Sequence, residues 1–144
     1  MQFKGRKLLV VGGTSGIGLE TARMVAEQGG SVVIVGNRAE KAEAARKELA
    51  ALVGESKVVA YSADLTDFAS VKGLIEKLAA EHKDIDLMVN SAGIYYPKAF
   101  VEHSLEDYDN FLNLNRAIFF LTRHVAAELV AQKKPGSIVN VTAA

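Results

Sequence analysis

Three glycines follow the first apolar segment of the chain at a spacing that suits an anion. Gly12, Gly16 and Gly18 come after the segment Lys7–Val11, whose last four residues are apolar. Glycine lets a phosphate or another backbone come close. A helix that begins here would add unpaired N–H groups and the positive end of its dipole. Residues 12–18, named here the glycine turn, therefore predict a pyrophosphate-binding site that also includes Thr14, Ser15 and Ile17.

The glycine turn has an ordinary alternative interpretation. Its spacing is not the G-x-G-x-x-G of the general dinucleotide fingerprint. A glycine-rich connection between a strand and a helix, without a ligand, would also use these residues. The rest of the chain must decide between the two.

The composition indicates one domain without a strong charge or redox signature. The chain has 144 residues, 17 Lys and Arg against 17 Asp and Glu, and no Cys. A formal net charge of zero argues against nucleic acid or an acidic membrane surface as a partner. Without Cys there is neither a disulfide nor a thiolate nucleophile. No apolar run reaches membrane-spanning length, and no His, Asp and Glu group has metal-ligand spacing. We therefore expect a cytoplasmic domain that binds no metal.

The elements that would position the glycine turn alternate regularly along the chain. Apolar, largely β-branched runs predict strands at 7–11, 31–36, 57–61, 85–89 and 137–141. Apolar periodicity and strong helix formers predict helices at 16–28, at 38–52, after the cap Thr66-Asp67, and from the capping box Ser104–Asp107 to about 132. Within the last helix, Ala117–Leu121 is apolar nearly all round, which predicts burial on more than one side.

Strands alternating with helices predict an α/β fold, a three-layer, doubly wound parallel sheet of about five strands. Ligands of such sheets bind beyond the carboxyl ends of the strands, where the strand order reverses. The glycine turn follows the first predicted strand, Asp64 the third, Asn90-Ser91-Ala92-Gly93 the fourth and Thr142 the fifth. All four features are therefore expected at one edge of the sheet.

In order and spacing, these motifs resemble the N-terminal part of the short-chain dehydrogenase/reductase family. The glycines fit its T-G-x-x-x-G-x-G motif, with Val11 where Thr is usual, and residues 90–93 fit its N-N-A-G motif, with Ser91 replacing the second Asn. The resemblance covers essentially the whole chain. It implies a Rossmann-like fold that lacks the family's C-terminal strands, so residues 1–144 are expected to be one truncated dinucleotide-binding domain.

The resemblance also implies roles for the residues that follow the strands. Asp64 and Leu65 would contact the adenine, although Asp64 could instead help to start the helix beyond Thr66. The N-N-A-G motif lies behind the adenine ribose in the family, which implies cofactor-binding positions at Asn90, Ala92 and Gly93. A turn-stabilising role for Asn90 is compatible with this position.

The catalytic residues of the family are only partly represented. Asn115 falls where family members hold a proton-relay water, with Asn113 as the alternative if the register slips. The family's catalytic Ser falls at Ala143, and the adjacent Thr142 is a weaker candidate for its role. The Tyr and Lys of the family's Tyr-x-x-x-Lys would lie beyond Ala144, and no such pair occurs within the chain.

The end of the second predicted strand favours NADP(H) over NAD(H). An NAD enzyme usually places Asp or Glu there to bind the ribose hydroxyls, and this chain has Gly36 followed by Asn37 and Arg38. An Arg can pair with a 2′-phosphate. Arg38 lies one residue beyond the family's usual Arg, and Ser15 stands where many NADP users carry a second basic residue.

Two hypotheses about function follow. In the first, the chain is the cofactor-binding part of an oxidoreductase that acts on a small carbonyl or alcohol substrate, the whole protein being a homo-oligomer as the resemblance implies. In the second, it is a dinucleotide-binding module or regulatory subunit without turnover. The missing sheet edge favours a fragment or an assembly with more protein. We expect the 144 residues alone to bind NADPH weakly and to reduce no carbonyl.

Overall fold

Residues 1–142 are described by the structure, a computed structural model. Its strands are β1 (Lys7–Val11), β2 (Ser31–Gly36), β3 (Val58–Ser62), β4 (Leu87–Asn90) and β5 (Ser137–Asn140). Its α-helices are α1 (Gly16–Glu27), α2 (Ala39–Val53), α3 (Phe68–Glu81) and α4 (Leu105–Gln132), and two 3₁₀ turns lie at η1 (Glu55–Lys57) and η2 (Phe100–Glu102).

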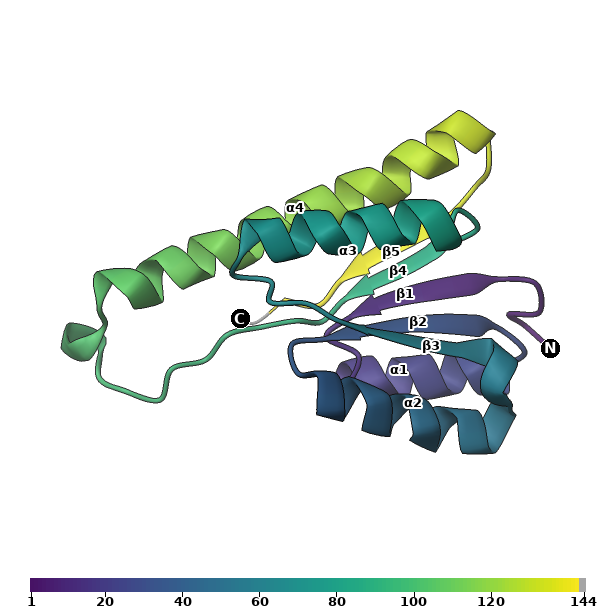
Figure 1. The fold of residues 1–144 in the computed structure, drawn as a ribbon, viewed down its shortest axis with the longest axis horizontal. Helices are drawn as coiled ribbons and strands as arrows, with labels where there is room; N and C mark the ends of the chain where they lie inside the picture. Colours follow the sequence, from purple (N-terminus) through teal and green to yellow (C-terminus); the bar gives the residue numbers. More distant parts are fainter. Residues whose placement is uncertain (143–144) are drawn as a thin grey trace.

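The five strands form one parallel sheet in the order β3-β2-β1-β4-β5. Helices α1 and α2 cover one face of the sheet, and α3 and α4 cover the other (Figure 1). The order reverses between β1 and β4, which pair in the register Val11↔Asn90 at their carboxyl ends. This arrangement confirms the predicted doubly wound, three-layer α/β fold and places the topological switch point beside the glycine turn.

Successive residues of the central strands pack into two separate cores. Leu9 and Val11 of β1 contact the α3 and α4 side, while Leu8 and Val10 contact the α1 and α2 side. All four side chains are essentially inaccessible to solvent. Burial on both faces explains why these strands are continuously apolar rather than alternating.

Several boundaries differ from those expected. The third strand begins at Val58 rather than at 57, because Glu55–Lys57 forms a 3₁₀ turn. The fourth strand begins at Leu87 rather than at 85, and the fifth ends at Asn140 rather than at 141. Asp86 lies just before β4, and its carboxylate binds the backbone N–H of Lys7 at 2.9 Å, which connects the chain segments where β1 and β4 begin.

The expectation that Ala117–Leu121 is buried on more than one side is wrong for the described residues. Ala117 and Leu121 pack into the core below the helix, but Phe119 is 62% exposed. Residues two positions apart on a helix point in nearly opposite directions. Within residues 1–142, the sheet and α3 cover one face of α4. No helix in this part of the chain combines the length and apolar character that crossing a membrane requires.

Candidate functional site

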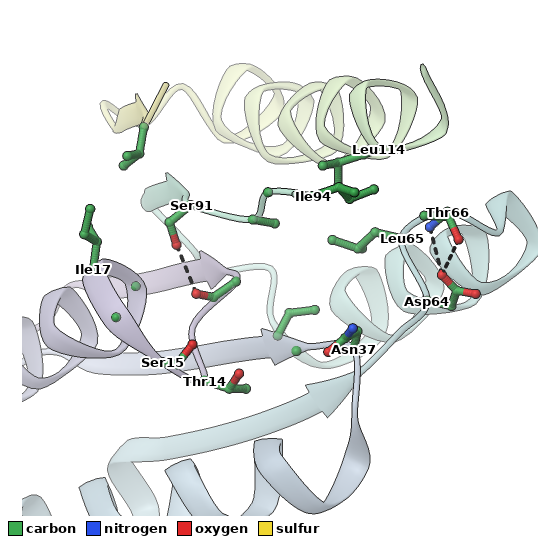
Figure 2. Close-up of a pocket in the computed structure, with 18 residues that line it drawn as sticks. Thr14, Ser15, Ile17, Asn37, Asp64, Leu65, Thr66, Ser91, Ile94 and Leu114 are labelled. Atoms are coloured by element: carbon green, nitrogen blue, oxygen red, sulfur yellow. Dashed lines mark hydrogen bonds between the residues drawn. The ribbon is translucent and has the colours of Figure 1, made fainter. Parts of the chain in front are cut away.

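A cavity of about 420 Å³ lies at the carboxyl edge of the sheet, beyond β1, β2, β3 and β4. Its walls come from the glycine turn, the end of β2, the segment after β3, the segment after β4, and α4 (Figure 2). This main cavity is lined by Gly12, Thr14, Ser15, Gly16, Ile17, Gly18, Val35, Gly36, Asn37, Asp64, Leu65, Thr66, Ser91, Ala92, Gly93, Ile94, Leu114 and Val141.

The glycine turn is held against β2 by two hydrogen bonds to one carbonyl. The N–H groups of Gly12 and Gly13 donate to Val35 O at 2.9 and 3.1 Å. Gly12 has a φ of +83°, and a Cβ added there would lie 2.6 Å from the backbone nitrogen of Ala92. Both the backbone angle and the close approach therefore require glycine at this position.

Helix α1 begins at the cavity wall without a side-chain cap. Its N-cap, Ser15, has an extended backbone and makes no capping hydrogen bond, and the first turn contains no acidic residue. By contrast, Asp67 caps α3 and Ser104 caps α4 with hydrogen bonds to backbone N–H groups. The first N–H groups of α1 and its positive dipole end are thus available to an anion.

Space for such an anion exists at the same place. Gly16, the first residue of α1, has a φ of +56°, and a Cβ added there would meet no atom within 4 Å. A Cβ added at Gly93, on the opposite wall, would also meet no atom within 4 Å. Open glycine backbone beside an uncapped helix N-terminus fits the pyrophosphate of a dinucleotide.

Ser91 connects the segment after β4 to the glycine turn. Its hydroxyl lies 3.0 Å from Gly12 O and 3.1 Å from Val11 O, and its backbone N–H donates to Val11 O at 2.8 Å. Figure 2 shows this side chain directed at the turn. Sequence reasoning noted Ser91 only as a departure from the family motif and did not place it in the site. A short hydroxyl opposite a glycine turn is the signal that was available.

The carboxylate of Asp64 is turned toward its own chain segment. Its Oδ1 accepts hydrogen bonds from the Thr66 N–H at 3.0 Å and from the Thr66 hydroxyl at 2.6 Å (Figure 2). The alternative role, helping to start the helix beyond Thr66, belongs to Asp67 instead, because Asp67 caps α3, which begins at Phe68. Asp64 and Leu65 nevertheless line the main cavity, so contact with an adenine stays a prediction.

Asn90 does not line the main cavity. Its side-chain amide is buried and donates to Asn140 Oδ1 at 2.7 Å and to Thr122 Oγ1 at 3.2 Å, which connects β4 to β5 and α4. Its Oδ1 has no hydrogen-bond partner among residues 1–142. The residues of the motif 90–93 therefore have different places. Ala92 and Gly93 line the main cavity, while Asn90 supports the sheet beneath it.

A second cavity of about 360 Å³ adjoins the main one between α4 and the end of β5. It brings together Asn90, Asn115 and Thr142, along with Asn140. Asn115 and Thr142, the two residues that the sequence predicted to be catalytic, thus line the same cavity. Ala143 lies outside the described residues.

The end of β2 contributes Asn37 but not Arg38 to the main cavity. Arg38 is exposed and is the N-cap residue of α2, with no capping hydrogen bond from its side chain. Sequence reasoning missed the hydrophobic wall formed by Ile94 and Leu114, and it did not place Thr66 or Val141 in the cavity. Gly36, which the sequence singled out because no carboxylate stands there, lines the cavity beside Asn37. Leu114 carried no local signal, because its place on α4 is 21 residues beyond Gly93 along the chain.

Comparison with known proteins agrees with this geometry. The family model described as short chain dehydrogenase matches residues 6–144. Nodulation protein G of Rhizobium sp. (strain N33) is 37% identical over 142 residues, which cover 98% of this chain and 56% of that protein. The 3-oxoacyl-(acyl-carrier-protein) reductase FabG of Thermotoga maritima is 34% identical, over 99% of this chain and 57% of that protein. The chain thus spans a little over half the length of these relatives.

Solved structures of short-chain oxidoreductases share the fold of this chain. A metagenomic short-chain oxidoreductase in complex with NADP superposes with a TM-score of 0.87 at 26% identity, covering 99% of this chain and 64% of that one. A short-chain dehydrogenase from Sphingobium yanoikuyae in complex with NADPH gives a TM-score of 0.83 at 30% identity, covering 94% and 52%.

Proposed function

Because this chain belongs to the short-chain dehydrogenase family, we propose that it forms the dinucleotide-binding part of an NADP(H)-dependent oxidoreductase. When bound, the nicotinamide would supply or accept the hydride exchanged with a carbonyl or alcohol substrate. The observation that carries the proposal is the uncapped N-terminus of α1 beside the open glycine backbone of the main cavity. Relatives named as reductases and dehydrogenases support the reaction class.

In this proposal the pyrophosphate binds the glycine turn. We assign its contacts to the N–H groups of Gly16, Ile17 and Gly18 and to the hydroxyls of Thr14 and Ser15, all residues that line the main cavity. Asp64 and Leu65 border the adenine end, and Ala92 and Gly93 border the ribose. The hydrophobic wall excludes water from the middle of the cofactor.

NADP(H) is preferred over NAD(H) because no carboxylate stands at the end of β2. Gly36 and Asn37 line the cavity there, and a carboxylate would repel a 2′-phosphate. Arg38 follows Asn37 directly with an exposed side chain, and we assign it to the 2′-phosphate, with which a guanidinium can pair. Two neighbours in the structural comparison were solved with NADP or NADPH, which supports the same preference.

Asn115 and Thr142 are the residues of the described chain that we assign to the substrate side of the site. Both border the second cavity, and both can donate and accept hydrogen bonds. Asn115 is assigned to holding a proton-relay water and Thr142 to binding the substrate oxygen.

Binding and turnover measured on the full protein that contains this sequence test the proposal. NADPH fluorescence is expected to change on titration with the protein, with NADH binding at least about tenfold more weakly because it lacks the 2′-phosphate. Loss of NADPH absorbance with a panel of ketones and aldehydes then tests for reduction. Absence of binding to either dinucleotide would contradict the proposal, and binding without any turnover would support a regulatory module instead.

A further inference from the structure

We propose that the methyl group of Thr14 keeps position 36 for glycine and thereby excludes the acidic residue that would select NAD(H). Thr14 is then a specificity-determining residue that acts through the end of β2. The inference rests on the proposed function, because it concerns which dinucleotide the main cavity accepts.

The backbone does not explain why position 36 is glycine. Gly36 is the last residue of β2 and pairs with Ser62 of β3 in the parallel ladder. It is not among the glycines with a positive φ, which are Gly5, Gly12, Gly16, Gly29 and Gly54. An ordinary strand residue accepts any L side chain on conformational grounds. The requirement must therefore come from the space around it.

Thr14 fills that space. A Cβ built on Gly36 would lie 2.3 Å from Thr14 Cγ2, which is closer than non-bonded carbon atoms approach. The Cβ and hydroxyl oxygen of Thr14 would both be at 3.4 Å, within ordinary contact. A single methyl group thus causes the overlap, and the hydroxyl does not.

The turn that carries Thr14 cannot move away freely. Gly12 and Gly13, just before it, are fixed to Val35 O by two hydrogen bonds. A Cβ on Gly13 would already lie 3.0 Å from the Ile34 side chain, so the turn and β2 are in close contact. Ser91 holds the turn from the other side through Gly12 O. Rotation of the Thr14 side chain remains, which β-branching restricts to few χ1 angles.

The consequence concerns the cofactor. An Asp or Glu at the end of the second strand binds the ribose hydroxyls of NAD. Here that side chain would begin inside the van der Waals envelope of Thr14, on a residue that is already buried. The residue after Gly36 that lines the main cavity is Asn37, which has no charge.

Thermal unfolding tests the steric part without any ligand. Gly36→Ala is expected to lower the melting temperature of the full protein by roughly 5 °C or more, as overpacking of a core does. Adding Thr14→Ser, which removes the methyl and keeps a hydroxyl, should restore most of the loss. Adding Thr14→Val, which keeps a methyl in each branch, should not. Gly73→Ala is the matched control, because a Cβ there meets nothing within 4 Å.

Dinucleotide titration tests the specificity part. Gly36→Asp alone should gain little affinity for NADH. Thr14→Ser with Gly36→Asp should raise the ratio of NADH to NADPH affinity at least about tenfold over the parent protein. Thr14→Ser alone, measured alongside, separates the effect of the lost methyl from that of the new carboxylate.

The outcomes distinguish the inference from the function on which it rests. A full shift to NADH by Gly36→Asp alone, or an unchanged melting temperature for Gly36→Ala, would overturn the inference and leave the proposed function standing. If the parent protein binds neither dinucleotide, both the proposed function and the specificity role fail. Rescue by serine but not by valine would then still establish the contact between Thr14 and Gly36.

Discussion

At the scale of single residues, Ile17 offers a direct test of the anion site. It is the second residue of α1, lines the main cavity and is 63% exposed. A carboxylate there interacts favourably with the helix dipole but repels a pyrophosphate. We expect Ile17→Asp to keep or raise the free energy of unfolding, by up to about 1 kcal/mol, while weakening NADPH binding severalfold.

Ile17→Asn is the matched control, because Asn has nearly the same shape as Asp but carries no charge. Chemical denaturation measures the stability of both variants and fluorescence titration measures their affinity. Equal losses of affinity in both variants would mean that the missing apolar side chain, rather than an anion at this helix end, is responsible.

We expect the stability of the fold to depend on pH through His82, which does not line the main cavity. Burial and the charge of Lys7 lower the pKa of His82 below 6.5, while Glu81 and Asp84 oppose the shift. Its Nδ1 lies 3.1 Å from Lys7 Nζ and its Nε2 lies 2.9 Å from the Tyr61 hydroxyl. Burial and the carboxylate of Glu81 raise the pKa of Tyr61 to about 12, so this phenol stays protonated.

The sign of that dependence follows from the lowered pKa. The unfolded chain binds a proton at His82 more readily than the folded chain, so stability is fully present above the unfolded pKa of 6.5 and is lost as the pH falls through the folded pKa. His82→Gln should reduce the slope of unfolding free energy against pH in this window. Burial also lowers the pKa of His124, so His124→Gln is measured beside it, and the fall in slope from the parent to each variant gives the share of that histidine.

At the scale of elements, the helix N-termini differ in capping: α3 and α4 have a side-chain cap, whereas α1 and α2 have none. Ser104 caps α4 by accepting a hydrogen bond from Asp107 N–H at 3.1 Å, and Asp107 accepts one from Ser104 N–H at 2.9 Å. Lys98 pairs with Asp107 and is the main cause of its lowered pKa. Ser15 occupies the same position at α1 without such a bond.

Substitution of these two serines should therefore have different effects on stability. Ser104→Ala removes a capping hydrogen bond and should cost about 1 kcal/mol. Ser15→Ala removes none and should change the free energy of unfolding by less than about half as much. Urea denaturation compares the two directly, and an equal loss in both would refute the distinction between a capped α4 and an open α1.

At the scale of the whole molecule, Asp86 connects three chain segments at the edge of the sheet opposite the cavities. Its carboxylate, 2% exposed, pairs with Arg6 and binds Lys7 N–H at 2.9 Å, and Lys134 Nζ lies 3.8 Å away. It thus joins the start of β1, the start of β4 and the turn between α4 and β5. Asp84 is nearby, but its carboxylate is 65% exposed.

We expect Asp86→Asn to destabilise the fold by roughly 2 kcal/mol, because charged hydrogen bonds to a buried carboxylate are lost. Asp84→Asn should cost less than about 1 kcal/mol, as for other exposed ion pairs. Denaturation curves of the two variants give the comparison. A larger loss for Asp84→Asn would show that the buried carboxylate is not the main connection.

Much of the architecture and part of the site could be predicted from the sequence. Continuous apolar strands, helix periodicity and the capping box at Ser104–Asp107 gave the correct elements within one or two residues. The order of motifs placed the glycine turn, Asp64 and Ala92-Gly93 around one cavity. The expected burial of Ala117–Leu121 on more than one side was wrong. Residue types show which faces of a helix are apolar, but they do not show which neighbours cover those faces.

The sequence by itself determined the layer arrangement and the edge that carries the site, because burial and turn signals are local and parallel strands all end at the same side. Tertiary structure alone decided the partners of individual side chains. Asn90 binds Asn140 rather than bordering the main cavity, Ser91 reaches the glycine turn, and Thr14 closes the space beside Gly36. These contacts join segments far apart in the chain and depend on tenths of an ångström, which no local residue pattern records.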